Sequence, residues 1–232
     1  MEKIEITSEQ LGELVDRIFP VLAEKGPAHT TMDLLAKRLS MSKRTLYEIF
    51  GSKDDMIRTV MEHLHNEYLR HLQEIYKRSD NMMEIMANVM IYHQQTMSKL
   101  SANFFRDMDE RCNHLRGDYE SNSMKWVGYI REAIDMGVRQ GVFRKDSNYN
   151  VIIPLIRVQM ESLKRIEEFF PPGITMVEAY NAIALGFLRS IATPSGMDTL
   201  DRLAGKFGMK ATDCPTYKDN INNNINDKVT KE

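Results

Sequence analysis

Apolar residues recur at spacings of three and four along nearly the whole chain, and no segment shows the sustained alternation of a strand. The first such stretch predicts a helix that begins after Thr7 or Ser8 and stops at Gly26-Pro27. Pro20 lies inside that span, so we expect it to kink the helix or to end its regular hydrogen bonding early. The pattern as a whole predicts an all-α protein.

Three polar residues then stand where helices are expected to begin. Thr31 is the predicted N-cap of a short helix that runs to about Leu39, and Ser42 is the predicted N-cap of a second short helix. Ser52 precedes a much longer helix at 53–78, whose first turn holds acidic residues suited to the positive end of the helix dipole.

The second half of the chain carries the same period, in predicted helices at about 122–137, 147–170 and 174–192. The last of these is apolar nearly all round, so it has to be covered on two sides, whereas a surface helix needs only one apolar stripe. We expect a second copy of the chain to cover one side and to pair with the helix before it as well. The predicted contact residues are Ala179, Ala182, Ile183, Gly186 and Phe187.

Residues 32 to 51 carry small and apolar side chains where a helix-turn-helix requires them. Leu35 is expected to face the core, Ala36 is small where the two helices cross, and Leu46 anchors the second helix. Such a pair leaves the start of its second helix pointing outward, toward a DNA major groove. The side chains available there are Ser42, Lys43, Arg44, Thr45 and Tyr47.

Charge supports this interpretation only locally. The chain has 31 Lys and Arg residues against 33 Asp and Glu, a net charge of −2, so any nucleic-acid surface has to be a patch. Residues 37 to 53 form such a patch, with Lys37, Arg38, Lys43, Arg44 and Lys53 against Glu48. A charged outer face is also what any amphipathic helix has, so the charge pattern alone leaves both interpretations open.

The stretch TTMDLLAKRLSMSKRTLYEIFGSKDDM, which begins at Thr30, resembles the DNA-binding segment of the TetR family of bacterial transcription regulators. That segment typically has a Thr-initiated helix, an Ala, a Gly-Val-Ser turn, Lys, Thr-Leu-Tyr, an aromatic-Phe pair and Ser-Lys-Glu. Here Ser40 stands in place of the turn glycine, so we expect a residue with a Cβ at positive φ, at a cost of about 1 kcal/mol. Arg44 stands where the family often has a small residue, and Pro20 is unusual in its first helix. The later order of helices, with GVRQGVFRKD at 137 to 146, is similar to the family's ligand-binding and dimerisation domain.

The resemblance implies DNA contacts at Thr31, Ser42, Lys43, Thr45, Tyr47 and Lys53, to which residue chemistry adds Arg44. Thr31 and Lys53 stand at helix starts, where backbone N–H groups and the dipole suit a phosphate. Lys43, Arg44 and Thr45 have donors that can read base edges. Tyr47 could stack or touch a phosphate, and it could equally be half core.

The family's effector cavity is usually enclosed by helices that correspond to the methionine-rich middle of this chain. Flexible thioethers suit irregular pockets, although methionine that simply fills a helical core is the simpler interpretation. The candidate walls and polar handles are Met86, Met90, Tyr92, His93, Phe104, Trp126, Tyr129 and Met160.

Other classes of chemistry lack a motif. We expect no enzymatic activity and no cofactor, because no nucleophile elbow, phosphate loop, HExxH or CxxC occurs. The spacing of His63, Glu67 and His71 is more typical of exposed helix surface than of a metal site. Cys112 and Cys214 match no metal spacing, and the chain shows neither a signal peptide nor an uninterrupted membrane span, which predicts a cytoplasmic protein.

The sequence therefore predicts three segments: a three-helix helix-turn-helix domain at 1–52, a helical regulatory, ligand-binding and dimerisation domain at 53–212, and a polar tail at 213–232. We expect a homodimeric repressor that binds a palindromic double-stranded DNA operator. A small, mainly apolar ligand would release it by tilting the helix at 53–78. Two alternatives stay open: a regulator controlled by a protein partner without a small-molecule effector, and a dimeric ligand-binding module whose DNA-binding domain is vestigial.

Overall fold

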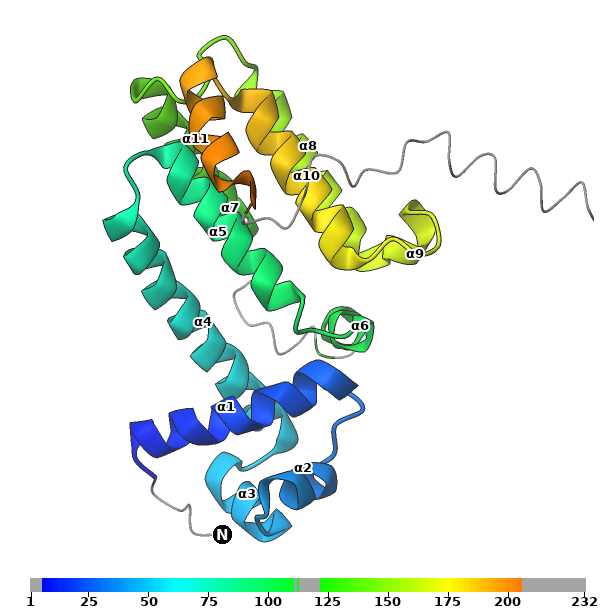
Figure 1. Ribbon diagram of the computed structural model, residues 1–232. Coiled ribbons are helices and arrows are strands. Elements are labelled where there is room, and N and C mark those ends of the chain that lie inside the picture. Colours follow the sequence, from blue (N-terminus) through cyan, green and yellow to red (C-terminus); the bar gives the residue numbers. More distant parts are fainter. Residues whose placement is uncertain (1–5, 111, 113–121, 206–232) are drawn as a thin grey trace, which may run out of the picture.

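The computed structural model describes residues 6–110, 112 and 122–205 (Figure 1). Within these ranges the fold is all-α, as the sequence predicts, and the one β pairing is an isolated antiparallel bridge between Phe143 and Ala192. The predicted tail at 213–232 lies outside the described residues. In chain order the helices are α1 (Ser8–Lys25), α2 (Met32–Leu39), α3 (Lys43–Phe50), α4 (Lys53–Arg78), α5 (Met82–Met97), α6 (Ala102–Glu110), α7 (Asn122–Arg139), α8 (Tyr149–Ser162), α9 (Ile166–Phe169), α10 (Met176–Ile191) and α11 (Pro194–Ala204).

The predicted N-caps of the first four helices are confirmed. Thr7 forms a reciprocal capping box with Gln10, and the side-chain oxygens of Thr31, Ser42 and Ser52 each accept from the backbone N–H three residues on. Helix α1 continues through Pro20 to Lys25, so the proline does not end it early.

The front of the molecule has its own hydrophobic core, and α6 belongs to it. Buried side chains of α1, α2 and α3 pack there with the first two turns of α4. Phe104 and Met108 of α6, together with Cys112, complete the same cluster. The rings of Phe104 and Phe19 meet edge to face at 6.5 Å, and the N–H of Ser101 donates to the carbonyl of Ala23 at 2.9 Å. In Figure 1, α6 accordingly lies directly beside α1.

The rear bundle is built from α5, α7, α8, α10 and α11 around a second core. The prediction of one helix at 147–170 was wrong. Helix α8 begins at Tyr149 and ends at Ser162, and a 3₁₀ turn (Leu163–Arg165) separates it from α9. Arg165, at φ −123° and ψ 49°, leaves the helical region, while Leu163 is buried against α10. No Gly or Pro marks this break, so the sequence pattern carried no stop signal.

Helix α11 is an element that the apolar pattern did not single out. Thr193 caps it with Pro194 at its first position, and its buried Leu200 and Leu203 pack in the rear core with side chains of α5. Among the described residues, no helix is long and apolar enough to cross a membrane.

Candidate nucleic-acid interface and effector site

The turn between α2 and α3 has the left-handed residue that the sequence predicts. Ser40 has φ 55° and ψ 40°, and no other non-glycine residue in the described ranges has positive φ. The N–H of Met41 donates to the carbonyl of Ala36 at 2.9 Å, which closes the end of α2. Arg17 of α1 donates to the carbonyl of Leu39 at 2.8 Å, so the turn is also held from outside. The start of α3 is therefore held in place by bonds from both α2 and α1.

At the start of α3, the hydroxyl groups of Ser42 and Thr45, both predicted to contact DNA, form a hydrogen bond with each other. The Oγ of Ser42 accepts from the backbone N–H of Thr45 at 2.9 Å and lies 2.8 Å from the Oγ1 of Thr45. Ser42 is exposed and Thr45 half-buried. Their first role is to begin the helix, and their remaining lone pairs or protons face outward.

The two basic residues of this first turn each pair with a carboxylate. The Nζ of Lys43 lies 2.8 Å from Asp33 of α2, and the Nε of Arg44 lies 2.7 Å from Glu48, one turn along α3. These hydrogen bonds, reinforced by the charge of each carboxylate, raise the pKa of both basic groups above their ordinary values. The Arg44 side chain is 80% exposed, so it is free to swing away from Glu48.

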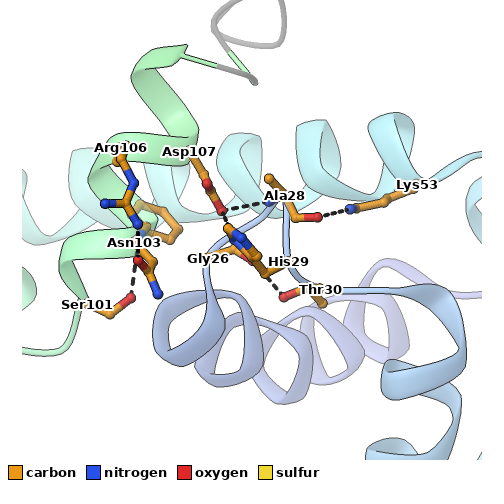
Figure 2. Close-up of polar contacts among 10 residues, drawn as sticks. Gly26, Ala28, His29, Thr30, Lys53, Ser101, Asn103, Arg106 and Asp107 are labelled. Atoms are coloured by element: carbon orange, nitrogen blue, oxygen red, sulfur yellow. Dashed lines mark hydrogen bonds and ion pairs between the residues drawn. The ribbon is translucent and has the colours of Figure 1, made fainter.

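The remaining predicted contacts are spread over three elements. Thr31 is exposed at the start of α2, where its Oγ1 accepts from the N–H of Leu34 at 3.1 Å. Lys53 is half-buried at the start of α4, and its Nζ donates to the carbonyl of Ala28 at 3.2 Å (Figure 2). Tyr47 is half-buried against the front core. Six of the seven residues stand at or beside the starts of α2, α3 and α4, and Tyr47 lies in the middle of α3.

Polar rings from three helices lie near one another behind the front domain: Tyr68 of α4, His93 of α5 and Tyr180 of α10, here called the tyrosine–histidine cluster. The rings of Tyr68 and His93 stack at 5.3 Å. Burial lowers the pKa of His93 to about 4. Burial, followed by the neighbouring Tyr68, raises the pKa of Tyr180, and burial raises that of Tyr68. All three groups are therefore uncharged at neutral pH.

Apolar side chains surround the Tyr180 member of this cluster. Tyr180 packs in a small core with Leu163, Ala179 and Ala184, against which half-buried Met90, Met97, Met160 and Phe170 lie. His93, Met90 and Met160 were predicted pocket residues, whereas Tyr68 and Tyr180 were not. Tyr180 could have been found from the sequence, because it stands inside the most apolar helix of the chain and a buried tyrosine hydroxyl usually has a hydrogen-bond partner.

The other predicted pocket residues are spread out. Met86 is buried in the rear core. Tyr92 borders the cluster, with its ring 6.0 Å from that of Tyr68 and 6.4 Å from that of His93, and it also stacks on His71 at 4.2 Å beside a surface hollow. Phe104 belongs to the front core, because α6 turns its apolar face to α1. The side chain of Tyr129 is 67% exposed. The predictions that Phe104 and Tyr129 line an enclosed effector cavity were therefore wrong. The side chain of Trp126 lies outside the described residues.

Helices α8 and α10 present an apolar outer face. Val151, Leu155 and Val158 lie one above another on α8 and are 50%, 55% and 66% exposed. Helix α10 lies beside α8 (Figure 1). Ala182 and Gly186 are exposed on α10, and Ile183 is half-buried. Ala179 and Phe187 are buried inside the protomer, so their assignment to a contact with a second copy was wrong. Ala179 and Phe187 lie on the side of α10 that faces the bundle, whereas Ala182 and Gly186 lie on its uncovered side.

The described part of the chain contains no cluster of three His, Cys, Asp or Glu residues placed to hold a metal ion. His63 lies 3.3 Å from Asp16 of α1, and His71 stacks on Tyr92, so the two histidines serve separate contacts.

The fold and the α2–α3 geometry define a helix-turn-helix DNA-binding protein with a helical rear bundle. Residues 14–60 match the family described as "Bacterial regulatory proteins, tetR family". The HTH-type transcriptional regulator YvaF of Bacillus subtilis strain 168 is 31% identical over 91 residues, which are 39% of this chain and 47% of YvaF. The match thus spans about half the length of that relative. Residues 14–60 thus carry the DNA-binding segment typical of the TetR family of bacterial regulators.

Solved structures extend the likeness of fold to the rear bundle. FadR of Bacillus subtilis in complex with stearoyl-CoA has a TM-score of 0.56 and 15% identity, over 77% of this chain and 98% of that one. A transcriptional regulator of Saccharomonospora viridis in complex with choline has a TM-score of 0.60 and 15% identity, over 81% of this chain and all of the other.

Proposed function

We propose that the protein is a sequence-specific repressor of transcription that acts in the bacterial cytoplasm and binds a palindromic operator as a homodimer. The observation that carries this proposal is the start of α3. The rigid Ser40 turn presents Lys43, Arg44 and Thr45 on the first turn of a helix of a size to enter the major groove. Thr31 and Lys53, at the starts of α2 and α4, are proposed to contact phosphates.

The homodimer is proposed to form through the outer face of α8 and α10. Three large apolar side chains in a row on α8 would be costly to leave in water, and Ala182 and Gly186 allow a second helix pair to approach closely. A two-fold axis at this face pairs each patch with itself, as a symmetric dimer requires. Two copies of α3 would then address the two halves of one palindrome.

The effector is proposed to bind at the tyrosine–histidine cluster and to be mainly apolar and uncharged. Methionine and aromatic side chains supply the walls, and the hydroxyls of Tyr68 and Tyr180 and the neutral imidazole of His93 supply hydrogen bonds. A charged ligand group would meet no countercharge among these three. Two proteins of similar fold are in complex with stearoyl-CoA and with choline, which supports a small-molecule effector for this protein without identifying it.

The proposed signal travels along α4. Tyr68 lies in its middle and Lys53 at its start, 15 residues and about 22 Å apart along one helix. A ligand that pushes on Tyr68 tilts the helix and changes the separation of the two α3 helices in the dimer, so the DNA-free form becomes more populated.

The test is selection of bound sites from a random duplex pool, followed by release of the enriched site with a panel of metabolites that spans neutral, anionic and cationic compounds. Enrichment of a palindrome and its release by neutral apolar compounds are expected. Enrichment without release by any compound favours control by a protein partner, and absence of any DNA binding at low salt favours the ligand-binding module. Release by charged compounds alone contradicts the proposed effector class.

A further inference from the structure

A buried carboxylate joins α6 to the turn between α1 and α2. Asp107 is 1% exposed, and its Oδ2 accepts from the backbone N–H of Ala28 at 2.9 Å and lies 3.1 Å from the Nδ1 of His29. Figure 2 shows the carboxylate pointing from α6 into this turn, residues 26–30. An isolated carboxylate is costly to bury, so the position is sustained by the donors of a segment 79 residues away in the chain.

Gly26 makes the close approach possible. It has φ +89°, in the region that favours glycine, and a Cβ built on it would lie 2.3 Å from the Oδ2 of Asp107. The same Cβ would lie 3.2 Å from the backbone of Asn103. Any other residue at position 26 would therefore both strain the turn and displace the Asp107 carboxylate.

The turn is held from a second side by the proposed DNA-binding surface. The N–H of Ala28 donates to Asp107 of α6, and the carbonyl of Ala28 accepts from the ammonium group of Lys53 at the start of α4. Thr30, fully buried, closes the turn by donating its hydroxyl to the carbonyl of Gly26 at 2.9 Å. The next residue is Thr31, the N-cap of α2 and a proposed phosphate contact.

We propose that Asp107 is a positioning residue for DNA binding. The Asp107 carboxylate holds the 26–30 turn through the N–H of Ala28, and this turn positions Thr31 and the Lys53 side chain. Asp107 lies on α6, which follows α5, the helix that carries His93 of the proposed effector site. Because α6 packs in the front core and follows α5 in the chain, this carboxylate holds the turn against the segment that leads out of the rear bundle, in addition to the continuous helix α4. A turn released from α6 loses more conformational entropy when it meets DNA, so removal of the carboxylate weakens binding. The inference rests on the proposed function, because it assigns Asp107 a part in binding the operator.

The experiment compares Asp107→Ala, Asp107→Asn, Gly26→Ala and the double variant Gly26→Ala/Asp107→Ala in operator titrations, with amide exchange measured at residues 26–35. Asp107→Ala is expected to weaken operator binding about tenfold and to speed exchange at Ala28, since the N–H loses a charged acceptor. Asp107→Asn keeps an acceptor oxygen and is expected to recover most of both losses. Because Gly26→Ala and Asp107→Ala break one contact, the double variant should lose far less than the product of the single effects.

Gly141→Ala is the matched control, because Gly141 has φ +75° but a Cβ there would meet nothing within 4 Å. It reports the cost of positive φ alone and is expected to leave operator binding unchanged. The proposal is overturned if Asp107→Ala binds the operator as wild type does, or if Ala28 exchanges at the wild-type rate in that variant. Multiplicative effects of Gly26→Ala and Asp107→Ala also overturn it. If the wild type binds no DNA, the proposed function fails and the exchange rates alone decide whether Asp107 holds the turn.

Discussion

The ammonium group of Lys43 on α3 lies 2.8 Å from the carboxylate of Asp33 on α2, so an acidic side chain sits within the surface proposed to face DNA. Asp33 is 71% exposed at its side chain and lies in the first turn of α2, beside the N-cap Thr31. The pair orients Lys43 in the free protein, but a phosphate or base has to compete with Asp33 for it, and Asp33 itself repels the backbone of DNA.

Asp33→Asn is therefore expected to strengthen binding to operator and to scrambled DNA by a similar factor, about threefold to tenfold. The substitution frees Lys43 for a phosphate, so the salt dependence should steepen by up to about 1 in the log–log slope. Fluorescence anisotropy over a salt series measures both. Weaker binding of the variant would mean that Asp33 is needed to orient Lys43.

Ser40→Gly is expected to stabilise the protein by about 0.5–1 kcal/mol, because glycine adopts positive φ without the steric strain of a Cβ at this position. The gain is smaller than the full strain, since glycine also widens the unfolded ensemble. Urea unfolding gives the change in stability, and operator affinity should stay as in wild type because the α3 surface is untouched. A destabilised variant would show that the Ser40 side chain stabilises the turn by more than its backbone strain destabilises it.

The sequence predicted what is determined by residues close together in the chain. Thr31, Ser42 and Ser52 cap helices through bonds to amides three residues on, and Ser40 takes its φ from the turn that joins two adjacent helices. The contacts it did not reveal join distant residues: Asp107 with Ala28, and Tyr68 with His93. The break at Leu163 and the inward side of Ala179 and Phe187 likewise depend on which neighbour each helix packs against, which periodicity does not specify.

Burial of His93 makes stability depend on pH. Its pKa is lowered to about 4 in the folded protein, below the ordinary value of 6.5, so the unfolded chain takes up a proton first as the pH falls. This contribution is fully present above pH 6.5 and is lost progressively down to about pH 4. His93→Phe should remove it, so wild type should lose on the order of 2–3 kcal/mol more than the variant between about pH 7 and about pH 4.5. Equal losses in urea unfolding at the two pH values would place His93 in contact with solvent.

Leu155→Glu is expected to convert the dimer to a monomer, because it puts a charge in the middle of the apolar face of α8. Leu69→Glu on α4 is the matched control, since Leu69 is also a helical leucine and is 42% exposed, but lies outside the proposed interface. Sedimentation at micromolar concentration measures the assembly. A monomeric wild type, or a Leu155→Glu variant that stays dimeric, would remove α8 from the interface.

Arg44 and Lys53 are expected to differ in what they read. The guanidinium of Arg44 is long, exposed and on the first turn of α3, where the O6 and N7 atoms of a guanine are natural partners. Arg44→Ala should therefore cost about 1–3 kcal/mol on the selected operator and relax the preference at one base position in each half-site.

Lys53 lies at the start of α4, and after its bond to Ala28 two ammonium protons remain for a phosphate. Lys53→Ala should weaken all DNA alike and reduce the salt slope by about 1 for each phosphate that the variant no longer binds. Both variants are titrated with operator and with scrambled DNA over a salt series. Equal weakening of the two DNAs by Arg44→Ala would make Arg44 a phosphate contact, and base reading would then fall to Lys43, Thr45 and Tyr47.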